Sequence, residues 1–171
     1  ILGRPGPLYQ VKGQELVKVQ THWDAINGAA AVQGGNLQFV VRASESGLAN
    51  QLITITPEGR QVGEPIVIKG GTANDAPQFR GLCSAADGTA YVTDWSENMI
   101  FWCKPDGTTG DLRNEFTGDW GSGPQPCLSP DQTMLYVPNR YENRLQIGVL
   151  QVHSSSKMPL RHGQWFFCLE D

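Results

Sequence analysis

Short apolar segments separated by glycine- and proline-rich turns run along the whole chain. Residues 37–41 and 99–103 are apolar at nearly every position, which is typical of strands that are packed on both faces. The 20 Gly and 11 Pro residues are spread along the sequence rather than clustered, as expected for many short strands joined by turns. No segment has a convincing helical pattern, so the sequence predicts an all-β protein.

One strand–turn–strand pattern occurs three times. Its copies lie at residues 31–41, 83–93 and 128–138. Alignment of Phe39, Tyr91 and Tyr136 gives steps of 52 and 45 residues, and residues 50–59 align with residues 98–107 at a constant step of 48. Periods of this size in a chain of strands are typical of the four-stranded blades of a β-propeller.

The repeats predict a single β-propeller domain or segment of about three and a half four-stranded blades, part of a six-bladed type of ring. The predicted units are a half blade at 1–20, with strands at 8–11 and 15–19, blade I at 28–70, blade II at 80–117 and blade III at 125–169. Such an arc leaves apolar flanks and a strand edge uncovered. The apolar residues 165–169 add to this surface. We therefore expect missing residues, another chain or a larger assembly to complete the ring.

Charge and hydropathy narrow the possible partners. The formal net charge is −4, and Lys and Arg form no run, so we expect neither nucleic-acid binding nor attraction to an anionic membrane. No apolar stretch approaches the ~18 residues of a spanning helix, and we expect no membrane insertion. The sequence opens at Ile1 without a Met, which suggests a trimmed or fragmentary start.

The four cysteines are expected to be free thiols. They are Cys83, Cys103, Cys127 and Cys168, with no C-x-x-C spacing and no His nearby in a zinc pattern. Two inter-strand steps separate Cys83 from Cys103 by roughly 9–10 Å, beyond the ~7 Å that a disulfide bridges. The alignment places Cys83 and Cys127 on opposite blade faces. Free thiols and the absence of N-x-S/T sites favour an intracellular or organellar compartment.

Two strings carry a family resemblance. The first string is residues 81–107, which include Asp87-Gly88-Thr89-Ala90-Tyr91-Val92-Thr93-Asp94 and Pro105-Asp106-Gly107. The second string is residues 128–137, which include Ser129-Pro130-Asp131-Gln132. They resemble the NHL-repeat and gluconolactonase/strictosidine-synthase-like group of β-propellers over about residues 28–152. The resemblance implies the blade rather than an activity, because the group holds lactonases, esterases and non-catalytic binding modules alike.

Hydrolases of the group hold a divalent cation in the central channel, bound by carboxylate and Asn oxygens at the starts of the innermost strands. The corresponding positions here hold Arg80, Gln125 and Gly28. A guanidinium repels a metal ion and Gly offers no ligand. Asp24 and Asn27 lie nearby and supply two oxygen ligands, which together with Gln125 would form the alternative calcium site. We expect no cofactor otherwise.

The loops on one face of the predicted propeller gather aromatic and charged residues, whereas the other face has mainly turn residues. The candidate ligand-binding residues are Trp23, Asp24, Arg80, Asp94, Trp95, Trp120, Arg140 and Tyr141, with Asp75 and Asp119 beside them. Aromatic and charged side chains on one face are typical of a binding surface. The competing interpretation is that Asp94 and Asn98 bind loop backbone and that Trp95 covers a blade edge.

No catalytic residue is predicted. The three His residues stand apart from any nucleophile-plus-acid pattern, and the serines at 154–156 lack the G-x-S-x-G of a nucleophile elbow. The sequence favours a non-catalytic propeller scaffold or binding module with a protein partner in a larger assembly. The alternative is a metal-dependent lactonase- or esterase-like hydrolase of the gluconolactonase type.

Overall fold

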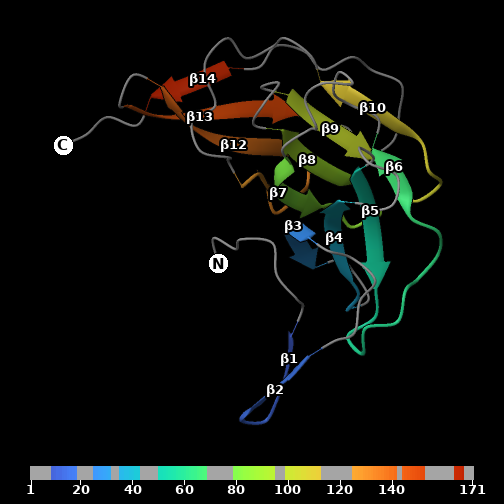
Figure 1. Ribbon diagram of the computed structural model, residues 1–171. Coiled ribbons are helices and arrows are strands. Elements are labelled where there is room, and N and C mark those ends of the chain that lie inside the picture. Colours follow the sequence, from blue (N-terminus) through green and yellow to red (C-terminus); the bar gives the residue numbers. More distant parts are fainter. Residues whose placement is uncertain are drawn as a thin grey trace.

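The computed structural model describes residues 9–18, 25–31, 35–42, 50–68, 79–94, 99–112, 125–141, 144–152 and 164–167. Within these segments the chain is all-β, with fourteen strands in four antiparallel sheets and no helix (Figure 1). A helix of the length and apolarity needed to span a membrane is accordingly absent from this part of the chain. The predicted fold class is confirmed at the level of an all-β protein of small antiparallel sheets, none of which closes into a barrel.

Three of the sheets have four strands each. Sheet I comprises β3 (Ala25–Ala31), β4 (Leu37–Arg42), β5 (Asn50–Ile55) and β6 (Ile66–Ile68). Sheet II comprises β7 (Phe79–Ser84), β8 (Ala90–Asp94), β9 (Met99–Cys103) and β10 (Thr109–Leu112). Sheet III comprises β11 (Cys127–Leu128), β12 (Met134–Tyr141), β13 (Arg144–Gln151) and β14 (Gln164–Phe167). In each sheet, strands that follow one another in the chain are neighbours in space.

The same turn chemistry closes two hairpins of sheet II, β7–β8 and β9–β10. Asp87 accepts a hydrogen bond from the backbone N–H of Thr89, and Asp106 accepts one from that of Thr108. The glycines that follow these aspartates, Gly88 and Gly107, have φ of 84° and 85°, a region that costs non-glycine residues conformational energy. The Asp-Gly pairs of the sequence therefore position the strand ends alike.

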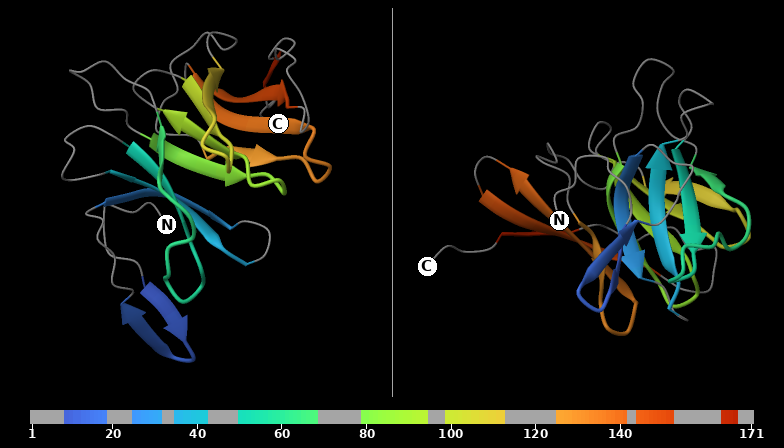
Figure 2. Two further views of the ribbon diagram at one scale, coloured as in Figure 1. Left: turned by 90° about the vertical axis from the view of Figure 1, so that its right-hand side faces the viewer. Right: turned by 60° about the horizontal axis from the view of Figure 1, so that its bottom comes forward.

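Sheet II lies between the other two sheets, which precede and follow it in chain order (Figure 2). One of its faces buries Leu82, Val92 and Phe101 against sheet I. The opposite face buries Tyr91 and Ile100 against sheet III. Because strand residues alternate between faces, the near-continuous apolar run of β9 is explained by cores on both sides of sheet II.

Glutamine side chains connect neighbouring sheets. The buried Gln38 of β4 accepts a hydrogen bond from the Ser84 hydroxyl and donates one to the Gly88 carbonyl, 3.5 Å away. At the second interface, the Gln132 amide oxygen accepts a hydrogen bond of 2.7 Å from the backbone N–H of Ala86. These bonds join adjacent sheets near their first turns, and those of Gln38 satisfy a buried amide that would be costly to leave unpaired.

The register corrects one sequence alignment. Leu37 pairs with Ala31, and Ala90 pairs with Ser84, so the hairpins of sheets I and II correspond at a step of 53 residues rather than 52. The aromatic pair Phe39 and Tyr91 is therefore out of register by one. A shift of one residue moves a side chain to the other face of a sheet, and similarity of residue type led to the wrong alignment.

The N-terminal hairpin consists of β1 (Tyr9–Lys12) and β2 (Glu15–Lys18), as the sequence predicts. It forms a two-stranded sheet of its own and projects away from the three larger sheets (Figure 1). Tyr9, Val11 and Leu16 share one of its faces, with 50%, 69% and 69% of their surface exposed. Within the described chain, β14 pairs with β13 and not with this hairpin.

Cys83, Cys103 and Cys127 are free thiols, which confirms that prediction for three cysteines; Cys168 lies outside the described residues. Cys83 on β7 and Cys103 on β9 are separated by β8, as expected. The prediction that Cys83 and Cys127 point to opposite faces is wrong. They pair with Tyr91 and Tyr136, equivalent residues of β8 and β12. The loop before β12 is one residue longer, so the sequence alignment displaced Cys127.

Candidate functional site

The predicted ligand-binding face lies largely outside the described residues. Trp23, Asp24, Trp95 and Trp120, together with Asp75, Asn98 and Asp119, are not among them. The remaining four positions, Arg80, Asp94, Arg140 and Tyr141, belong to strands β7, β8 and β12. Asp94 ends β8 and pairs with Phe79, next to Arg80, and Arg140 and Tyr141 end β12. The backbone therefore carries all four at the same end of sheets II and III.

Asp94 is the one residue of this group whose side-chain environment is described. It is fully buried, as is its neighbour Thr93. The Thr93 hydroxyl accepts a hydrogen bond of 3.0 Å from the backbone N–H of Gly81. Burial of both side chains at this strand end favours a structural role for Asp94 over direct contact with a ligand in solvent.

A β-bulge occurs at the same place in sheets I and II. The register of β3 shifts between Ile26 and Gly28, and that of β7 shifts between Phe79 and Gly81. The extra residues are Asn27 and Arg80. The sequence alignment matched Arg80 to Gly28; the paired strands instead match it to Asn27, because the two sheets correspond at a step of 53 residues rather than 52.

Gln125, the third residue of the alternative metal site, lies just before β11 and donates a hydrogen bond from Nε2 to the Leu82 carbonyl. Its amide nitrogen therefore joins the segment that leads into β11 to strand β7 of sheet II. Among the residues that the structure describes, no group of three or more His, Cys, Asp or Glu side chains is arranged to hold a metal ion.

Two adjoining cavities of about 370 and 400 Å³ lie between sheets I and II, at the opposite end of the sheets from Asp94. Both are lined by Glu64, Ile66 and Pro105. We call the combined space the I–II groove. Its other lining residues are Gln38, Thr54, Val62, Gly63, Pro65, Val67, Ala86, Asp87, Gly88, Asp106, Gly107 and Thr109.

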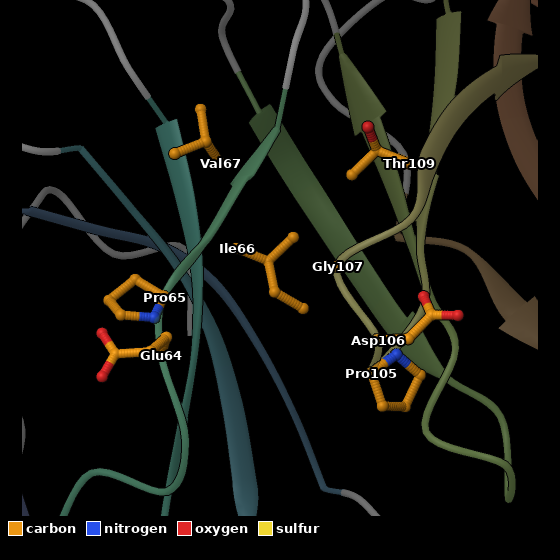
Figure 3. A pocket seen from close by; sticks show the side chains of 8 residues that line it. All are labelled: Glu64, Pro65, Ile66, Val67, Pro105, Asp106, Gly107 and Thr109. Atoms are coloured by element: carbon orange, nitrogen blue, oxygen red, sulfur yellow. The ribbon is translucent and has the colours of Figure 1, made fainter.

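Apolar surface occupies the middle of the I–II groove and carboxylates flank it. Ile66 extends from β6 toward the loop that carries Pro105 and Gly107 (Figure 3). The carboxylates of Glu64 and Asp106 lie on opposite sides of this apolar centre (Figure 3). Both acidic residues are exposed, so the groove presents negative charge on each bank.

Close packing fixes the sheet II bank. The Pro105 ring lies against Gly88, where an added Cβ would come within 2.7 Å of Pro105 Cγ. Hydrogen bonds from the backbone and side chain of Thr108, followed by the field of Lys104, lower the pKa of the Asp106 carboxyl group. The Asp106 carboxyl group is therefore ionised at neutral pH, and hydrogen bonds within its own turn hold it in place.

Trp102 forms a second packed feature on sheet II. Its indole lies against Gly110, directly opposite on β10, and leaves no room for a Cβ there. The Lys104 ammonium group lies 5.7 Å from the centre of the Trp102 ring, within the range of a cation–π interaction. A glycine on an outer strand is thus covered by a cross-strand aromatic ring.

The buried thiols and phenol lack nucleophilic character at neutral pH. Burial raises the pKa of Cys103 to about 12. Burial, with a contribution from Cys127, raises the pKa of Cys83 to about 12. Burial also raises the pKa of Tyr91 to about 12, with contributions from Asp87 and Cys83. A reactive thiol needs a lowered pKa, so Cys83 and Cys103 serve packing.

The sequence did not indicate the I–II groove. Pro105-Asp106-Gly107 is typical of a turn, and residues 62–67 have no motif. The groove exists because packing of sheet II on sheet I brings these two segments together across some forty positions of sequence. The one available signal is that both segments combine a proline, an acidic residue and a glycine.

No protein-family model matches the chain, and no curated protein sequence matches it.

Proposed function

We propose that this chain is a segment of a β-propeller, with sheets I to III as blades and the β1–β2 hairpin as half of another, and that it acts as a non-catalytic scaffold or binding module for a protein partner. The observation that carries the proposal is the two-sided burial of sheet II. Its neighbours Ile100 and Phe101 are buried in different clusters, one facing sheet III and the other facing sheet I. Such sheets require a further packed neighbour at each end of the array.

Two surfaces support the need for a partner. The hairpin exposes Tyr9, Val11 and Leu16 together on one face, although two-stranded sheets are marginally stable alone. On sheet III, Tyr136 and Val149 pair on the face turned away from sheet II and are half-buried. The corresponding face of sheet II is covered by sheet III. Exposed apolar surface of this kind marks interaction sites.

Light scattering and binding of an apolar fluorescent dye to the purified chain test this role. We expect an assembly larger than 18.7 kDa or strong dye binding, and a decrease in either with the double variant Val11→Lys, Leu16→Lys. Glu15→Lys, in the same hairpin but already charged, is the matched control. A monomer that binds no dye would contradict the proposal.

The alternative remains a metal-dependent hydrolase of the lactonase or esterase type. The bulges at the equivalent positions Asn27 and Arg80 favour this alternative, because bulges are over-represented next to active sites. The two functions differ in their response to calcium. A rise in melting temperature with calcium, by mass action on the folded state, together with lactone or ester hydrolysis, would replace the scaffold role with the hydrolase.

A further inference from the structure

The I–II groove combines a cavity, an apolar centre and one sign of charge. Its lining includes Glu64, Asp87 and Asp106 but, among the described residues, no Lys, Arg or His. The combined space falls in the range of about 300–1,000 Å³ that is usual for ligand sites. Ile66 and Pro105 supply apolar contact between the acidic banks. A complementary ligand is therefore positively charged on both sides of an apolar group.

The sheet I bank is also the edge of a sheet. β6 is the outermost strand of sheet I and pairs only with β5 among the described strands. Val67 within this strand is 43% exposed, and Val62, in the segment that leads into it, is 42% exposed. An edge strand with exposed apolar side chains offers backbone N–H and C=O groups to another extended chain. Addition of a strand to such an edge is a common way of binding peptides.

We propose that the I–II groove binds a short, extended, basic segment of a protein partner. An apolar side chain of the segment contacts Ile66 and Pro105, and Lys or Arg side chains flanking it contact Glu64 and Asp106. The inference names the chemistry of the partner for the binding module proposed above and rests on that function. It assigns a surface at the opposite end of the sheets from Asp94.

The arrangement suits separate basic side chains better than a metal ion. The carboxylates of Glu64 and Asp106 lie on opposite banks with Ile66 between them (Figure 3). A divalent cation needs several oxygen ligands converging on one point, and no such cluster of acidic residues occurs in the described part of the chain. An extended peptide instead turns every second side chain to one side, so Lys, an apolar residue and Lys at alternate positions match an apolar centre between charged banks.

The test is a titration of the full chain with a fluorescein-labelled peptide roughly eight residues long, like an ordinary strand, that has Lys, Val and Lys at alternate positions and Ser between them. Fluorescence anisotropy gives the affinity, and amide chemical shifts give the location. We expect saturable binding that weakens with added salt, with the largest shifts at Ile66, Val67 and Gly107. The same peptide with Glu in place of Lys is the charge control and is expected not to bind.

Variants separate the groove from general electrostatics. The double variant Glu64→Gln, Asp106→Asn removes both bank charges, and the new amide on the second bank keeps an oxygen that accepts the Thr108 hydrogen bond. Glu15→Gln, Glu58→Gln removes the same charge from exposed residues that do not line the groove. We expect the first pair to weaken binding about three- to tenfold, the range for two exposed ion pairs, and the second pair to leave it unchanged.

Three results overturn the inference: no binding of the basic peptide, equal weakening by the two double variants, or equal binding of the acidic peptide. The hairpin variant Val11→Lys, Leu16→Lys keeps this test separate from the scaffold role, because it is expected to bind the peptide normally. A chain that assembles through its hairpin and ignores the peptide refutes the groove inference alone. A chain that binds the peptide but stays monomeric and binds no apolar dye refutes the scaffold role alone.

Discussion

Truncation of one buried side chain on each face of sheet II gives a direct measure of its two-sided packing. Leu82 faces sheet I and Ile100 faces sheet III, and both are 0% exposed. Replacement of either by Ala removes three carbon atoms, which at about 0.8 kcal/mol each corresponds to ~2.4 kcal/mol of lost transfer free energy. The cavity left behind adds to this, so we expect each variant to lose about 2.5–5 kcal/mol of unfolding free energy.

Urea denaturation followed by tryptophan fluorescence measures both losses. Val67→Ala, on the exposed outer strand of sheet I, is the control and should change stability by less than about 0.5 kcal/mol. Ile100→Val, expected to cost about 0.5–1.5 kcal/mol, provides a milder change if the Ala variant does not fold. A sheet with only one buried face would tolerate one of the two Ala variants. A loss below about 1 kcal/mol for either Leu82→Ala or Ile100→Ala would refute the reasoning.

Three further predictions concern the turns and thiols. Gly88→Ala should cost at least about 1 kcal/mol more than Gly107→Ala in urea denaturation, because both have positive φ but only Gly88 is packed against a proline ring; equal losses would show that strain alone matters. Iodoacetamide at pH 8 with peptide mass mapping should label the exposed Cys127 rapidly and the buried Cys103, whose pKa is raised to about 12, only on unfolding; early labelling of Cys103 would contradict its burial. Hydrogen bonds within its turn lower the pKa of Asp131. Its ionised form therefore stabilises the fold above the unfolded-state pKa near 4, and this contribution is lost as the pH falls through the lower folded-state value. The Asp131→Asn variant should lose stability less steeply than the unmodified chain below about pH 4, and parallel pH profiles of the two proteins would contradict this.

The fold could be predicted from the sequence wherever local chemistry decides it. The Asp-Gly turns at Gly88 and Gly107, and the apolar run of β9, indicated strand boundaries and two-sided burial because turn geometry and strand alternation depend on adjacent residues. The register between repeats was beyond this reasoning. The aromatic residues Phe39 and Tyr91 favour a step of 52, whereas the paired strands correspond at 53. An offset of one residue assigns a side chain to the wrong face of a sheet.

The candidate site was less predictable than the fold. The sequence singled out aromatic and charged loop residues, of which Asp94 is buried, while the I–II groove was missed. Glu64 and Asp106 belong to segments that carry no motif alone and become one site only through packing of sheet II on sheet I. Grooves formed between sheets depend on such long-range contacts, and a single sequence carries little signal for them.

Methyl–methyl nuclear Overhauser effects from sheet II test the stacked arrangement most directly. We predict contacts from Leu82 and Val92 to Val40 and Leu52 of sheet I. Contacts from Ile100 to methyl groups of sheet III are expected in the same sample. Contacts on one side only, with Ile100 close to nothing beyond its own sheet, would contradict the central position of sheet II and the proposed blade architecture that depends on it.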